Sequence, residues 1–150
     1  MIDRKHIITC KAATAMRILK AGTAYFALVF GTGFVLGTVR TLWVVPRLGV
    51  RTAELLETPF MLVAIVFAAA WISRRIDNVG GSSSRVAVGV LALALLLTAE
   101  VIMGVAVLGL SFVEVFTMHD PVSGTVYYAM LGVFAWMPWL FWKYGKHVAA

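Results

Sequence analysis

The stretch VAVGVLALALLLTAEVIMGVAVLGL, residues 86–110, decides the fold class of this chain. Its one charged side chain is Glu100. The hydrocarbon core of a bilayer is about 30 Å thick, and about 20 residues of helix are enough to cross it. Because no water is available there to satisfy peptide groups, an apolar segment of this length must be helical. The stretch therefore predicts a transmembrane helix.

Three further apolar stretches lie on either side of it, at about residues 21–43, 54–73 and 122–142. The composition agrees, since 61% of the 150 residues are hydrophobic, 13% are charged and the mean hydropathy is +0.93. An ordinary soluble domain is far more polar. The sequence therefore predicts an all-α integral membrane protein, with a single membrane domain over residues 1–150 built as a four-helix transmembrane bundle.

Lysine and arginine are distributed unevenly between the two ends of the predicted spans. Ten of the 13 lie before the first span, between the second and the third, or after the fourth. Because basic residues are retained on the cytoplasmic side, we expect a multi-pass protein of the bacterial inner membrane with cytoplasmic N- and C-termini. Aromatic residues near the span ends agree with this placement of the spans in the membrane, because such rings prefer the membrane interface. They are Trp43, Trp71, Tyr127, Tyr128, Trp139 and Trp142.

The N-terminal segment KHIITCKAATAMRILK, residues 5–20, mixes basic and apolar residues. This pattern predicts a short basic interfacial helix along the cytoplasmic surface, with its charges on phosphates and its apolar side chains among the headgroups. The net charge of +6 is then expected to attract anionic lipids. Such an organisation allows the bilayer, a second copy of the chain or another membrane protein as partners. Nucleic acid is not expected, since no soluble basic domain carries the charge.

Small residues recur at helical spacing in the first predicted span. Gly33 and Gly37 form a G-x-x-x-G pair, which places both on one helix face. Small residues on one face let another helix approach closely, and this is how helices associate in lipid. The pair therefore predicts a packing face. Its partner is another helix of the bundle or a second copy of the chain.

Three charged residues are expected at membrane depth. Arg40 lies three residues before Trp43 at the outer end of the first span, and Glu57 lies about one turn below the outer surface in the second. Because a short loop joins these spans, we expect a salt bridge between the two charges. Glu100 lies about 21 Å above Val86 at 1.5 Å per residue, and a carboxylate at that depth must face the bundle. The pattern predicts a buried polar cluster of Arg40, Glu57 and Glu100.

Two interpretations of this cluster stay open. In the first, Arg40 satisfies the acids and the cluster is a clasp that fixes the register of the helices. In the second, two acids near one arginine leave a shared, titratable proton, and the cluster binds a proton, a cation or a polar headgroup.

The outer loops offer weaker candidates. Arg47 and Arg51 could receive an outer-face phosphate or contact a partner, although Arg51 stands one helical turn from Glu54 and local pairing is the simpler interpretation. Before the fourth span, Glu114 precedes the pair His119 and Asp120. These three side chains could bind a divalent metal. However, adjacent residues point in different directions and no second histidine is near, so we interpret this segment as a solvated turn. No metal site and no cofactor are expected.

The stretch GTVRTLWVVPRLGVRTAELLE, residues 37–57, resembles small uncharacterised bacterial inner-membrane proteins with four predicted spans. The resemblance is clearest over the first two spans. It implies the same four-span class and no particular activity.

No sequence motif of an enzyme stands out. The chain has no H-E-x-x-H, G-x-S-x-G or Walker lysine loop. We therefore expect a small accessory or scaffold-type membrane protein with a buried Arg/Glu clasp and no catalytic activity. The alternative is a small transporter or channel subunit that moves protons or cations through Glu100.

Overall fold

The computed structural model describes residues 4–75, 81–106, 109, 111, 113–114 and 121–145. The secondary-structure elements of the described residues are all helical, which confirms the all-α prediction for this part of the chain. Three of these helical segments are long and apolar enough to cross a membrane, Lys11–Leu48, Val50–Arg75 and Ser82–Ala106. These helices indicate a membrane protein. The elements are α1 (Arg4–Val39), η1 (Arg40–Val44), α2 (Val45–Leu48), α3 (Val50–Arg75), α4 (Ser82–Ala106) and α6 (Pro121–Gly145).

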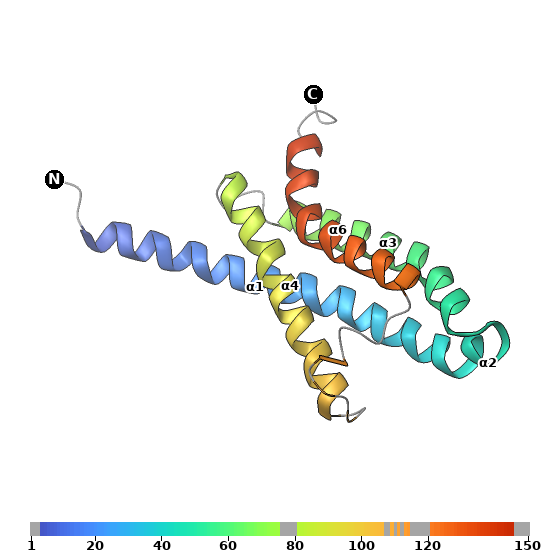
Figure 1. The fold of residues 1–150 in the computed structure, drawn as a ribbon. Coiled ribbons are helices and arrows are strands. Elements are labelled where there is room, and N and C mark those ends of the chain that lie inside the picture. Colours follow the sequence, from blue (N-terminus) through green and yellow to red (C-terminus); the bar gives the residue numbers. More distant parts are fainter. Residues whose placement is uncertain are drawn as a thin grey trace.

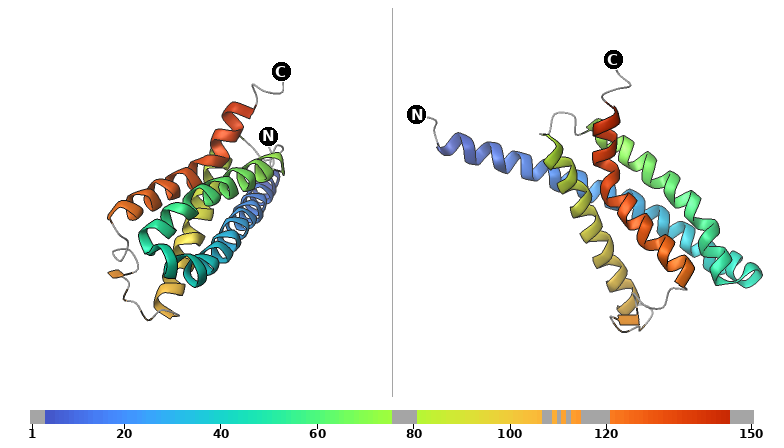
Figure 2. Two further views of the ribbon diagram at one scale, coloured as in Figure 1. Left: turned by 90° about the vertical axis from the view of Figure 1, so that its right-hand side faces the viewer. Right: turned by 45° about the horizontal axis from the view of Figure 1, so that its top comes forward.

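The four long helices pack in a ring. Helix α1 contacts α3 and α4, and α6 contacts the same two helices from the other side. Helix α4 crosses α1 and diverges from it toward the end where α1 runs into η1 (Figures 1 and 2). We call this the η1 end. The opposite end, where α3 stops at Arg75 and α4 begins at Ser82, is called the arginine end.

Helix α1 differs from the predicted arrangement. A separate interfacial helix over residues 5–20 was expected before the first span, but α1 continues without a break from Arg4 to Val39. Its 36 residues correspond to about 54 Å at 1.5 Å per residue. The segment around the expected junction, Ile18 to Ala21, consists of good helix formers and contains no proline. The first part of α1 therefore projects beyond the other helices as part of the same rod (Figure 1).

The η1 end is shaped by Pro46 and Gly49. A five-residue π-helical turn, η1, stands directly before the turn that contains Pro46, whose ring nitrogen cannot donate a hydrogen bond. Gly49 then adopts a φ of 78°, which favours glycine, and its N–H bonds to Val45 O at 3.0 Å. Helix α3 begins directly afterwards at Val50. Pro59 therefore lies in the interior of α3.

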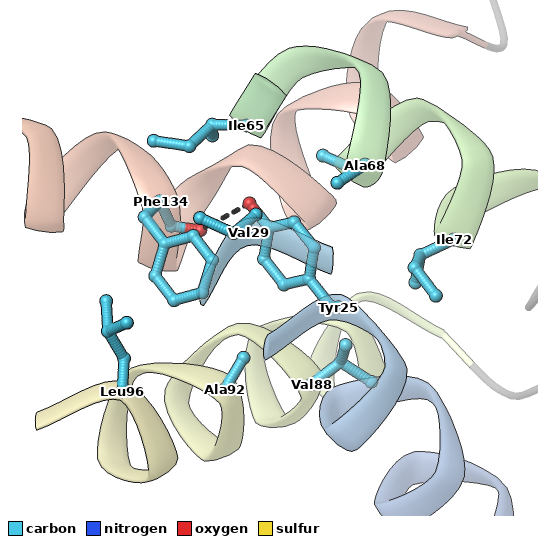
Figure 3. Close-up of a cluster of buried hydrophobic side chains, with 10 residues drawn as sticks. Tyr25, Val29, Ile65, Ala68, Ile72, Val88, Ala92, Leu96 and Phe134 are labelled. Carbon is cyan, nitrogen blue, oxygen red and sulfur yellow. Dashed lines mark hydrogen bonds between the residues drawn. The ribbon is translucent and has the colours of Figure 1, made fainter. Parts of the chain in front are cut away.

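The core lies between the four long helices, whose buried side chains point toward one another (Figure 3). Each helix contributes side chains that are almost completely buried, such as Val29 from α1, Ile65 from α3, Val88 from α4 and Phe134 from α6. Small residues between them keep the helices near one another. The full buried cluster is Tyr25, Val29, Ile65, Ala68, Ala69, Ile72, Val88, Ala92, Leu96 and Phe134.

A proline in α6 explains why a tyrosine is tolerated in this core. Pro138 has no N–H, so the carbonyl of Phe134, four residues earlier, lacks its usual helical donor. The Tyr25 hydroxyl donates to that carbonyl at 3.0 Å, and the Tyr25 and Phe134 rings stack with centroids 4.5 Å apart (Figure 3). Helix α6 bends in this region (Figure 1). Tyr25 thus satisfies an acceptor that the helix of Phe134 leaves open.

Helices α4 and α6 approach each other closely at Gly89. A side-chain carbon there would collide with the carbonyl oxygen of Ala135, so α4 and α6 meet backbone to backbone. The predicted packing face behaves differently within the chain. A side-chain carbon at Gly37 would meet nothing within 4 Å, and one at Gly33 would meet only the flexible Met61 side chain, at 3.3 Å. Neither glycine brings the backbone of another helix of this chain close, and the Gly33 and Gly37 pair as a helix-packing face stays a prediction.

The arginine end carries ordered basic and aromatic residues. Arg85 is almost fully buried and its Nη1 donates to Ser73 O, at the end of α3, at 3.4 Å. Trp139 Nε1 donates to Ser82 Oγ at 2.8 Å. The guanidinium of Arg75 lies 4.6 Å from the ring centroid of Trp71, a cation–π arrangement. Aromatic rings next to cations suit the boundary between lipid and water.

Candidate functional site

Arg40 makes ion pairs at the η1 end. Its Nη1 lies 3.2 Å from Glu57 Oε2 and 3.8 Å from Glu54 Oε1. The two acids are three residues apart on α3 and share one helix face. The expected salt bridge between Arg40 and Glu57 is therefore present. We call Arg40, Glu54 and Glu57 the clasp.

Local sequence explains why these three charges meet. Arg40 is the first residue of η1, and the reversal at Gly49 folds α3 back along α1. The clasp lies largely out of solvent, with side-chain exposures of 32% for Arg40, 18% for Glu54 and 14% for Glu57. Within the described part of the chain, Glu54 Oε2 and Glu57 Oε2 are buried and accept no hydrogen bond. The clasp thus holds more acceptor capacity than its one arginine satisfies.

Glu100 lies on α4 and is only partly buried. The Tyr127 hydroxyl, from α6, donates a hydrogen bond to Glu100 Oε2. The predicted cluster has Arg40 between Glu57 and Glu100. In the structure the second acid at Arg40 is Glu54, and Glu100 accepts a hydrogen bond from Tyr127 of the adjacent helix α6.

A cleft of about 590 Å³ joins the two polar groups. Arg40, Glu54 and Glu57 line it together with Glu100 and Tyr127. Four core residues labelled in Figure 3, Val29, Ile65, Leu96 and Phe134, also line it, and its walls are apolar residues of all four long helices. These apolar residues include Phe30, Phe34, Met61, Leu96, Leu131 and Phe134. The cleft fills the space left where α4 diverges from α1.

The glycines of the predicted packing face lie in this cleft. Both Gly33 and Gly37 line it, which explains why a side-chain carbon at Gly37 meets open space. Small residues on α1 here leave volume unfilled and do not bring another helix of this chain close.

The remaining predicted candidates lie apart from the cleft. Arg47 in α2 and Arg51 in the first turn of α3 are exposed at the η1 end and do not line it. Glu54, the predicted local partner of Arg51, has an ion pair with Arg40. Their proposed contact with a phosphate or a partner stays a prediction.

Glu114 takes part in a local capping arrangement. Its carboxylate accepts a hydrogen bond from Ser111 N at 2.7 Å, and its own N–H donates to Ser111 Oγ at 3.3 Å. This is the reciprocal bonding of a capping box. The hydrogen bonds from Ser111 lower the pKa of the exposed Glu114 carboxyl. His119 and Asp120, its proposed neighbours, lie outside the described residues. Among the described residues, no cluster of three or more His, Cys, Asp or Glu side chains is arranged to hold a metal.

Sequence reasoning missed the contact between Tyr127 and Glu100. It assigned Tyr127 to the membrane interface, because aromatic residues near a span end have that preference. A carboxylate at depth needs a hydrogen-bonding partner, and the nearby tyrosines on a neighbouring span were the available signal. Helix rotation, which decides between Tyr127 and Tyr128, could not be read from the pattern.

Scans against protein-family models, curated proteins and solved structures find no match for this chain. The resemblance of residues 37–57 to small inner-membrane proteins therefore stays a prediction. The site must be interpreted from its own chemistry.

Proposed function

We propose that this chain is a four-span integral protein of a bacterial inner membrane, with both termini in the cytoplasm. In this arrangement α6 is the fourth span. Its 25 residues correspond to about 37 Å, enough to cross a hydrocarbon core of about 30 Å. The arginine end faces the cytoplasm in agreement with the retention of basic residues on that side. The projecting part of α1 then reaches anionic lipid headgroups.

Within the membrane, we propose an accessory or scaffold role with no catalytic activity. The observation that carries this proposal is the clasp, in which one arginine of η1 contacts two acids of α3. Charges paired with each other at the end of two helices fix the register of those helices. A rigid pair of helices with a defined register is what a partner in the membrane needs to recognise.

Topology is tested with reporter fusions. Reporters inserted within residues 80–84 or fused after residue 150 are expected to be active in the cytoplasm, and a reporter near residue 123 on the opposite side. Reporter activity from residue 150 on the periplasmic side would contradict the proposed orientation.

The accessory role is tested by native electrophoresis of mildly solubilised membranes. We expect the protein to migrate in an assembly with another membrane protein, and Arg40→Leu to release it while Arg47→Leu, at an exposed arginine outside the clasp, does not. Migration of the unaltered protein by itself would contradict the accessory role.

A second candidate function is a transport subunit for protons or cations. The observation that favours it is the position of Glu100 in the cleft with Tyr127 as donor. Vesicles that contain the purified protein and a pH-sensitive dye test it. A proton leak that disappears in Glu100→Gln supports transport, and the absence of a leak in both proteins contradicts the proton pathway.

A further inference from the structure

The cleft has the dimensions and walls of a small-molecule site. Its volume of about 590 Å³ falls within the range of about 300–1,000 Å³ that is usual for ligand pockets. Phe30, Phe34 and Phe134 bring three aromatic rings to its lining, and Met61, Leu96 and Leu131 add flexible aliphatic surface. Such walls bind an apolar body of about the size of a few aromatic rings.

The charges in the cleft favour a cation. Its lining contains three carboxylates, Glu54, Glu57 and Glu100, but a single guanidinium, Arg40. In their ionised forms the lining groups carry a net charge of −2. Unbalanced carboxylates are expensive at membrane depth unless they bind a proton or a cation. A positive charge inside the cleft would therefore be stabilised, and aromatic rings would stabilise it further through cation–π contacts.

We propose that the cleft binds a membrane-soluble organic cation, a molecule with an apolar body and one positive charge. The positive charge lies between Glu100 and the two clasp acids. The apolar body lies against the rings of Phe30, Phe34 and Phe134. This binding function goes beyond the accessory role and does not depend on it.

Other occupants match the cleft less well. A bare Ca²⁺ or Mg²⁺ ion needs about six or more oxygen ligands at close range, whereas most of this lining is hydrocarbon. An anionic amphiphile would meet the same apolar walls but would be repelled by the carboxylates. Of these three classes, only an organic cation uses both the walls and the charge.

The test is equilibrium binding of radiolabelled tetraphenylphosphonium to the purified full chain in detergent. Tetraphenylborate, an anion of nearly the same shape, is the matched control for the sign of the charge. We expect saturable binding of the cation that tetraphenylborate does not displace. Equal binding of the two probes would overturn the proposal.

Two variants separate the contribution of the cleft's negative charge to binding from the contribution of its open volume. Glu100→Gln removes one carboxylate and keeps its size and a hydrogen-bond acceptor for Tyr127, so we expect at least a tenfold loss of affinity. Gly37→Leu fills open space in the cleft and is expected to abolish binding without lowering thermal stability. Gly132→Leu is the control, because Gly132 also has open space around it but does not line the cleft.

The outcomes are distinct. No saturable binding to folded protein, or unchanged binding in Gly37→Leu, would show that the probe does not occupy the cleft. Displacement of the probe by phosphatidylethanolamine but not by phosphatidylglycerol would show that the natural occupant is an amine lipid, which also overturns the proposal. If organic cations bind but the native assembly is absent, only the accessory role fails.

Discussion

The two halves of the helix ring are held together by different forces. Toward the arginine end, α4 and α6 touch backbone to backbone at Gly89, and Tyr25 completes the hydrogen bonding of α6. Toward the η1 end, the helices diverge around a cleft, and the ion pairs of Arg40 join η1, which continues α1, to α3. One half depends on close packing and the other on charge. Close packing leaves no room for a ligand. The proposed cation-binding site therefore lies in the half where the helices diverge.

The difference follows from which small residues face which neighbour. Gly89 faces the backbone of α6 and removes the space between two helices. Gly37 faces the cleft and creates space. Two glycines in transmembrane-type sequences thus have opposite consequences, and their substitutions should separate the two halves.

The largest expected effect is that of Gly89→Leu. Any side chain at this position meets the carbonyl of Ala135, which cannot move without shifting α6. We expect a loss of about 3 kcal/mol or more in the free energy of unfolding, measured by denaturant titration in detergent. The matched substitution Gly37→Leu should change it by less than about 0.5 kcal/mol. Equal losses would show that the two halves are packed alike.

The next effect is that of removing the clasp cation. Arg40→Leu leaves Glu54 and Glu57 without their arginine, and partial exposure of the site moderates the cost to about 2 kcal/mol. The triple variant Arg40→Leu, Glu54→Gln, Glu57→Gln should recover most of this stability, because no unpaired charge remains. If the triple variant is no more stable than Arg40→Leu, charge does not hold the η1 end together.

A smaller effect is expected from Tyr25→Phe, which keeps the stacked ring and removes the hydroxyl. The Phe134 carbonyl then loses its donor, at a cost of about 1–2 kcal/mol. In a Pro138→Ala background this cost should fall, because alanine can supply the missing helical N–H to the same carbonyl. Thermal unfolding of the four proteins in this cycle measures the coupling. An unchanged cost would mean that Pro138 is not the reason for the Tyr25 bond.

How much of the fold and of the site could be predicted from the sequence depends on how far apart the interacting residues lie along the chain. The apolar runs predicted the helices, and the short loop between Arg40 and Glu57 predicted their ion pair, because both are local in sequence. The role of Gly89 was missed since its collision partner, Ala135, is 46 positions away and helix rotation decides whether they meet. What Gly33 and Gly37 face could not be predicted for the same reason: spacing places two residues on one face but does not say what that face meets.

The smallest expected effect concerns an acid outside both halves, Glu114, and sharpens the contrast with the acids of the cleft. Its bonds come from Ser111, three residues away, so its environment should not depend on the helix ring. These bonds lower its pKa below the ordinary value of 4.5. A lowered pKa in the folded state means that the capping contact stabilises the loop at neutral pH and is lost as the pH falls through the folded-state pKa. Titration of the Glu114 carboxyl carbon by NMR should give this low pKa, and Ser111→Ala should raise it toward 4.5. If Arg40→Leu shifts the pKa of Glu114 as much as Ser111→Ala does, the loop is coupled to the clasp and the acid is not locally satisfied.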